Sequence, residues 1–231
     1  MKRTLLISDI HGEYDSFIQL LEKVKYNPKE DQLVLLGDYI DRGPDSKRVI
    51  EKIMDLRKEG AITLMGNHDR MMIDATDRKE KGWERWERNG GLATLANYHS
   101  GEDVAKIPET EEYHRHVEFL RSLDYYHETE DYIFVHAGVE PGKHPKDTKE
   151  WTLIWIREDF FRHYKGDKTV VFGHTPAKYL NKDKSNHIYF GENNVIGIDG
   201  GAVYGGQLNC LELPSRKTYS IKSKESDEKA K

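Results

Sequence analysis

Five apolar segments of the sequence each run into side chains that can bind a metal ion. The segments are predicted strands at residues 4–8, 33–37, 62–66, 132–135 and 169–173. Carboxylate oxygens and imidazole nitrogens are common ligands of divalent ions in hydrolytic sites, so the pattern indicates metal-assisted hydrolysis. The side chains concerned are Asp9, His11, Asp38, Asn67, His68, His136 and His174.

A single polar residue after a strand indicates little, because such residues usually cap helices, form turns or satisfy local hydrogen bonds. Five cases carry more weight, since ligands bind at the edge of a sheet where the carboxyl ends of its strands meet. Without a cation, the clustered carboxylates and imidazoles would lose hydration and repel one another. A divalent ion removes this cost and keeps the carboxylates charged.

The donors are too many for one tetrahedral zinc ion. They suit two divalent ions about 3.5–4 Å apart that share a bridging carboxylate. Ligation by oxygen and imidazole without thiolate favours manganese, iron, zinc or a similar ion such as nickel, and the ligand types do not rank them. We expect manganese first among these.

Strand and helix patterns alternate over the first seventy residues. Apolar residues at helical spacing predict one helix over residues 13–25 and another that begins at Asp45 or Ser46 and ends at Gly60. This order predicts a parallel sheet with helices on both faces. Residues 70–130 have a charged, helical pattern without a strand signal, which predicts a helical insertion.

The remaining segments predict short strands with glycine-rich turns and no interdomain linker. We therefore expect a single domain over residues 1–221, followed by a charged, disordered tail over residues 222–231. The only cysteine, Cys210, excludes an intramolecular disulfide and is expected to be a packed thiol.

Charge and composition exclude several classes of partner. The net charge is −5 and the charged residues, 33% of the chain, are of mixed sign, so we expect neither nucleic-acid nor membrane binding. The N-terminal apolar run is too short for a signal peptide, and no stretch is long enough to span a bilayer. We expect a cytoplasmic location.

The motifs "SDIHG", "GDYIDRG", "GNHD", "HAG" and "GHT" occur in this order between residues 8 and 175. Together they resemble the phosphoprotein phosphatase family of metallophosphoesterases, above all its bacterial and bacteriophage serine/threonine protein phosphatases. Ser8 is one departure, because the family often has glycine there. The resemblance implies a calcineurin-like α/β fold, in which a β-sandwich of two sheets is flanked by helices.

The resemblance also implies a metal centre that uses Asp38 as the bridge. The first ion would bind Asp9, His11 and Asp38. The ligands of the second ion would be Asp38, Asn67, His136 and His174.

The resemblance gives the remaining motif residues roles in catalysis. Arg42 and Arg157 would clamp the substrate phosphate in a fork geometry that lysine lacks. His68 would protonate the leaving group, and Asp41 would accept its other N–H and raise its pKa. Asp69 is the alternative partner of His68.

The leading functional hypothesis is dinuclear-metal-dependent hydrolysis of phosphomonoesters by a metal-activated hydroxide, with phosphoserine or phosphothreonine proteins as substrates and small phosphoesters as other candidates. The alternative is hydrolysis of dinucleoside polyphosphates such as diadenosine tetraphosphate. Asp41 disfavours the symmetrically cleaving type, which tends to lack this aspartate, while Trp83 or Trp86 could stack on a base. The stretch "NGG" makes Asn89 a candidate phosphate contact. A non-catalytic binding module is disfavoured, because every ligand position is filled.

Overall fold

The computed structural model describes residues 2–99 and 105–223, which form two mixed five-stranded sheets. The first sheet has the strand order β10-β9-β1-β2-β3, and the second has the order β4-β5-β6-β8-β7. The strands are β1 (Arg3–Ile7), β2 (Asp31–Leu35), β3 (Ile62–Thr63), β4 (Tyr126–Glu128), β5 (Tyr132–Val135), β6 (Thr169–Phe172), β7 (Tyr189–Phe190), β8 (Val195–Gly197), β9 (Gln207–Leu213) and β10 (Lys217–Lys222).

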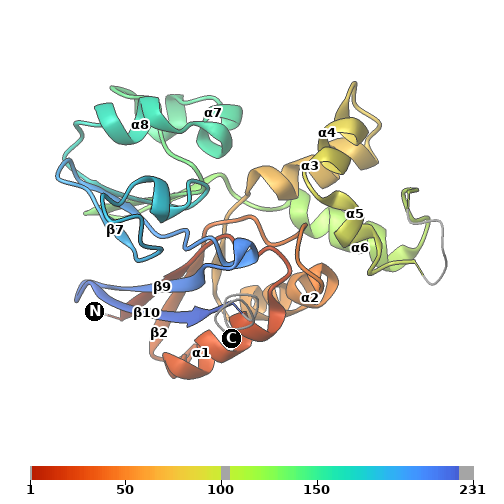
Figure 1. Cartoon of the computed structure of the whole chain (residues 1–231), viewed down its shortest axis with the longest axis horizontal. Helices are drawn as coiled ribbons and strands as arrows, with labels where there is room; N and C mark the ends of the chain where they lie inside the picture. The colour runs from red at the N-terminus through yellow and green to blue at the C-terminus, as the bar shows by residue number, and fades with distance from the viewer. Residues whose placement is uncertain (1, 100–104, 224–231) are drawn as a thin grey trace.

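Helices cover the outer faces of both sheets and form a separate group at one side (Figure 1). Helices α1 and α2 pack beneath the first sheet, α7 and α8 pack over the second, and α3 to α6 gather to the right in this view. The helices are α1 (Tyr14–Lys23), α2 (Ser46–Lys58), α3 (Asn67–Thr76), α4 (Gly82–Arg88), α5 (Gly91–Leu95), α6 (Glu111–Arg121), α7 (Glu150–Trp155) and α8 (Glu158–His163), with 3₁₀ turns η1 (Pro145–Asp147), η2 (Ala177–Tyr179) and η3 (Ala202–Tyr204).

The core consists of three apolar layers. In β1, Leu5 and Ile7 pack with Ile50 of α2, whereas Leu6 faces the other way and packs with Phe134 of β5. This alternation places the second sheet, not a layer of helices, on the inner face of the first. The expectation of helices on both faces of one sheet is therefore wrong, while the two-sheet sandwich implied by the family resemblance is confirmed.

Most predicted elements lie where the sequence places them. The first two helices occupy Tyr14–Lys23 and Ser46–Lys58, with Asp45 as the N-cap residue of the second. The described part of the region 70–130 is mainly helical. The expectation that this region contains no strand is wrong, because β4 pairs antiparallel with β5. β4 is a three-residue edge strand, too short to give a clear alternation.

The C-terminal strand includes the first residue of the expected tail. Lys222 is the last residue of β10, and the Ser223 N–H donates to the Gly206 carbonyl oxygen at 3.0 Å. Residues 224–231 of that tail lie outside the described residues. None of the described helices is long and apolar enough to cross a bilayer.

The turn after β2 depends on a glycine. Gly37 has φ +96°, and a Cβ atom there would lie 2.4 Å from the Gly66 nitrogen in the turn after β3. Both turns carry candidate metal ligands, Asp38 and Asn67, so this close contact fixes how the two strand ends meet.

We predict that Gly37→Ala lowers the free energy of unfolding by more than about 3 kcal/mol, because it combines a left-handed backbone with a steric clash. Gly60→Ala is the matched control, since Gly60 has φ +101° but no atom within 4 Å of an added Cβ. The control is expected to lose about 1–2 kcal/mol from backbone strain alone. Urea unfolding of both variants measures the difference, and equal losses would contradict the role of the contact.

Candidate metal centre and active site

Side chains that follow strands of both sheets gather in one place, around Asp38, which we call the seam. At the seam the His136 ring, after β5, donates from Nδ1 to the Leu36 carbonyl oxygen of the first sheet at 2.9 Å. The His174 N–H, after β6, donates to the Asp9 carboxylate at 3.0 Å. The predicted donors are therefore gathered here, and all are buried: Asp9, His11, Asp38, Asn67, His68, His136 and His174.

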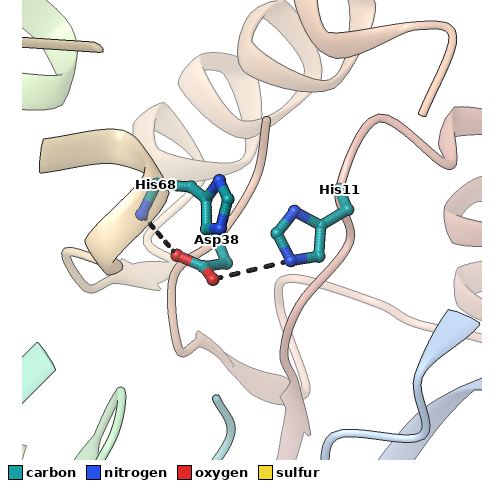
Figure 2. Close-up of side chains that lie close together, drawn as sticks. All are labelled: His11, Asp38 and His68. Carbon is teal, nitrogen blue, oxygen red and sulfur yellow. Dashed lines mark hydrogen bonds and ion pairs between the residues drawn. The ribbon is translucent and has the colours of Figure 1, made fainter. Parts of the chain in front are cut away.

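Asp38 lies at the centre of this group. Its carboxylate belongs to two sets of three ligand atoms, each set lying within 4.8 Å: one with His11 and His68, the other with His136 and His174. Figure 2 shows Asp38 between His11 and His68, with the His68 backbone N–H donating to Asp38 Oδ1 at 2.9 Å. A carboxylate shared by two imidazole groups is the geometry that a bridging ligand requires.

Backbone carbonyl groups orient two of the imidazoles. His11 Nδ1 lies 2.7 Å from the Ile40 oxygen, and His136 Nδ1 lies 2.9 Å from the Leu36 oxygen. A neutral imidazole that donates from Nδ1 keeps a lone pair on Nε2. Both Nε2 atoms lie 3.5 Å from Asp38, and the Nε2 lone pair of His11 accepts an N–H of Arg42 at 2.8 Å.

The hydrogen bonding of His174 and His136 tests whether this donor set fits a metal ion. Within the described chain, His174 Nε2 is buried without a hydrogen-bond partner. His136 Nε2 lies 3.0 Å from Asn67 Oδ1, which places two acceptors face to face when Nδ1 carries the proton. A divalent cation would satisfy these acceptors, so the residues present fit a metal ion.

Burial has opposite effects on the carboxylates and the imidazoles of the cluster. It raises the pKa of Asp9 and Asp38, and it lowers the pKa of His11, His136 and His174, because each charged form loses hydration. The 3.5 Å contacts with Asp38 are therefore not ion pairs at neutral pH. A bound cation would lower the pKa of the carboxylates again, and the neutral imidazoles would coordinate it.

The backbone of the site is strained. Six residues of the strand-end loops have φ between 44° and 74°, in the left-handed region that costs non-glycine residues about 1–3 kcal/mol each. Hydrogen bonds between the loops hold them there, such as His11 N–H to the Asp38 carbonyl oxygen at 3.0 Å. The six residues are Asp9, His11, Asp38, Asp41, Arg42 and His174.

His68 pairs with Asp41, as expected. The His68 Nδ1 atom lies 2.6 Å from Asp41 Oδ2, whereas Asp69 accepts backbone N–H groups of Asp38, Tyr39 and Gly66. Asp69, the alternative partner, therefore does not pair with His68.

The expected effect of Asp41 on the His68 pKa is wrong for the protein alone. Burial lowers the pKa of His68 well below its ordinary value, and the nearby Arg42 and His136 add to this shift. Burial also raises the pKa of Asp41 to about 7, although the hydrogen bonds that this carboxylate accepts from Thr94 and Trp86 act to lower it.

The helical insertion supplies the remaining hydrogen bonds to Asp41. Trp86 Nε1 of α4 donates to Asp41 Oδ1 at 2.9 Å, and the Thr94 hydroxyl of α5 donates to the same oxygen at 2.7 Å. Trp86 is 1% exposed, and Trp83 packs edge-on against it. Trp86 is thus a buried hydrogen-bond donor and not the base-stacking surface that the sequence analysis considered.

Beside the metal donors lies a cavity of about 350 Å³, the site cavity. Arg42 and Arg157 both line it, as predicted for phosphate-binding residues. Arg42 Nη1 lies 2.8 Å from His11 Nε2, and Arg157 Nη1 donates to the His174 carbonyl oxygen at 3.0 Å. Asn89 also lines the cavity, but its amide donates to the Arg85 carbonyl oxygen at 2.7 Å.

Asp199 is a site residue that the sequence analysis missed. It follows β8, is 4% exposed and lines the site cavity, and its Oδ1 accepts the Gly201 N–H at 2.8 Å. Burial raises its pKa well above the usual range, and Asp9 adds to the shift. The stretch "VIGID" is one more apolar run into a carboxylate, so the pattern used for the other strands could have found it.

The chain belongs to the calcineurin-like phosphoesterase family, whose family model matches residues 2–207. It is therefore a phosphoester hydrolase of a divalent-metal family, and its Asp and His clusters suit such a metal site. This confirms the metallophosphoesterase fold and class predicted from the motifs.

Relatives by sequence carry nucleotide-hydrolase names. The chain is 32% identical over 246 residues to the asymmetrical bis(5'-nucleosyl)-tetraphosphatase PrpE of Oceanobacillus iheyensis, covering 95% of this chain and 92% of that protein. It is 30% identical to the protein of the same name in Bacillus subtilis, covering 94% and 93%. These names favour the alternative hypothesis over the leading one.

Solved structures share the fold at lower identity. A candidate diadenosine tetraphosphatase has a TM-score of 0.69 at 23% identity, covering 96% of this chain and 94% of that one. A serine/threonine protein phosphatase from Saccharomyces cerevisiae has a TM-score of 0.63 at 12% identity, covering 96% and 79%. The fold is therefore common to both candidate functions.

We predict that Trp86→Phe lowers the free energy of unfolding by about 2–4 kcal/mol, since a buried carboxylate loses a donor and the ring shrinks. Trp83→Phe, on the same helix but half-buried, is expected to cost less than about 1.5 kcal/mol. Urea unfolding measures both variants. Equal losses would show that the bond from Trp86 to Asp41 contributes nothing specific.

Proposed function

We propose that this protein hydrolyses dinucleoside polyphosphates with two divalent ions, manganese first among the candidates, held by the residues of the seam. The supporting observation is the lining of the site cavity. Three cationic side chains, Arg42, Arg157 and Lys178, line it together with the aromatic rings of Trp155, Tyr179 and Tyr204. Cations suit a chain of phosphates, and the exposed rings among these, Tyr179 and Tyr204, suit a nucleobase.

The names of the sequence relatives support the same substrate class. They are called asymmetrical bis(5'-nucleosyl)-tetraphosphatases. Asp41 disfavours only the symmetrically cleaving type of nucleotide hydrolase, so it does not oppose this proposal. Asymmetric hydrolysis of a tetraphosphate chain gives a nucleoside monophosphate and a nucleoside triphosphate.

In this proposal the first ion is held by Asp9, His11 and Asp38, and the second by Asp38, Asn67, His136 and His174. When bound, such ions supply a hydroxide nucleophile near neutral pH and offset the charge of the phosphoryl oxygens. Arg42 and Arg157 then bind the remaining oxygens of the attacked phosphate from the cavity wall.

The roles of His68 and Asp41 depend on the leaving group. Asp41 fixes the His68 ring through Nδ1 and leaves Nε2 free. Burial keeps the pKa of His68 low in the protein alone, so Nε2 would carry a proton to the leaving oxygen only once the bound anionic substrate raises that pKa. A nucleoside triphosphate is a good leaving group and needs little help, whereas a serine or threonine alkoxide needs a full proton. The pair therefore supports a second candidate function, hydrolysis of phosphoserine or phosphothreonine.

Cysteine-based phosphatase chemistry does not suit this chain. Cys210 lies within β9, is 0% exposed and has its pKa raised by burial to about 12. A thiolate nucleophile requires the opposite environment, with a lowered pKa and access to the substrate.

We predict that the protein with added manganese cleaves diadenosine tetraphosphate at least tenfold more efficiently than a phosphothreonine peptide. The comparison measures kcat/KM for both substrates under the same conditions and identifies the nucleotide products. Asp38→Asn is the blank, because it removes the shared ligand. Preference for the peptide would overturn the proposed substrate class and support the second candidate function.

A further inference from the structure

The site cavity is too small for a whole dinucleoside polyphosphate. Its volume of about 350 Å³ lies at the lower end of small-ligand sites, which span roughly 300–1,000 Å³. If the proposed function holds, on which this inference rests, the phosphate chain and second nucleoside must leave the cavity at its rim. The question is which surface receives them.

A second, more open cavity of about 870 Å³ shares one lining residue, Tyr179, with the first. We call it the outer cavity. Its wall includes the aromatic rings of Phe161, Tyr189 and Phe190. Tyr179 is 67% exposed and Phe190 is 42% exposed, so both rings are accessible to a ligand.

The exposure of these rings is unusual within the described chain. Only four large apolar or aromatic side chains there are strongly exposed, and three of them, Tyr179, Tyr204 and Phe190, line one of the two cavities. Burying such rings would be favourable, so a surface that leaves them accessible suits a ligand with a flat, stackable base.

A cation of the site cavity, Lys178, lies beside the ring that both cavities share. The Lys178 ammonium lies 5.2 Å from the Tyr179 ring centre and 6.0 Å from the Tyr204 ring centre. It makes no ion pair within residues 2–99 and 105–223. A phosphate chain that passes from the site cavity to the outer cavity would meet this charge.

The segment that carries both residues is firmly tied to the metal centre. Lys178 and Tyr179 belong to η2, which begins three residues after His174. The Ala177 N–H donates to the Asp199 carbonyl oxygen at 2.8 Å, and the Tyr179 N–H donates to the Pro176 carbonyl oxygen at 2.9 Å. The position of Tyr179 relative to the attacked phosphate is therefore fixed by the fold.

We propose that the outer cavity is a subsite for the distal nucleoside of the substrate. The base stacks on Tyr179, with Phe190 in the wall of the same cavity, and Lys178 binds the phosphate chain beside Tyr179. This subsite would select substrates with a second nucleoside over simple phosphomonoesters.

The test compares kcat/KM for diadenosine tetraphosphate and p-nitrophenyl phosphate in the manganese-loaded protein. Tyr179→Leu is expected to lose about tenfold more efficiency on the dinucleotide than on the small ester, mainly through KM, because one stacking contact is lost. Tyr179→Phe is the matched control, since it keeps the ring and is expected to keep the wild-type ratio. Lys178→Met is expected to change the ratio in the same direction as Tyr179→Leu.

The outcomes separate this inference from the proposed function. Dinucleotide cleavage by the wild type with an unchanged ratio in Tyr179→Leu would overturn the subsite alone. An equal loss in Tyr179→Phe would also overturn it, because the ring would not be the recognised feature. No dinucleotide cleavage by the wild type would overturn the proposed function and the subsite together. A selective loss on a phosphothreonine peptide would assign the outer cavity to peptides and overturn the proposal.

Discussion

The burial of Asp38 among imidazoles is the constraint on which the rest of the structure depends. A carboxylate that is 2% exposed and faced by four neutral rings is unfavourable unless a cation shares the space. The two sheets meet at this residue, and hydrogen bonds from His136 to Leu36 and from His174 to Asp9 join them there. The fold thus assembles a metal-binding cluster from chain segments more than a hundred residues apart.

The helical insertion positions Asp41 and His68, the pair proposed to transfer a proton. Trp86 and Thr94 both donate to Asp41 Oδ1, the carboxylate oxygen that His68 does not contact. In effect, a segment that supplies no metal ligand determines the orientation of His68. This explains why a charged, mostly helical region belongs to the active site although its sequence has none of the family motifs.

The strand-end pattern predicted the residues of the seam because it depends only on local sequence and on where parallel strands end. It could not predict the second sheet as the inner neighbour of β1, since the apolar run "LLI" is buried on both faces and looks the same against helices or strands. It also could not reveal that Trp86 donates to Asp41, a contact across 45 residues. Asp199 was within reach of the same pattern, yet it lay in a stretch interpreted only as short strands with glycine-rich turns.

The central claim is that Asp38 bridges two ions. It is tested most directly by electron paramagnetic resonance of the manganese-loaded protein, together with its metal content. Two manganese ions that share a carboxylate are magnetically coupled, so the account predicts two ions per chain and a coupled spectrum that Asp38→Asn abolishes. A single ion per chain, or the spectrum of isolated ions in the wild type, would contradict it.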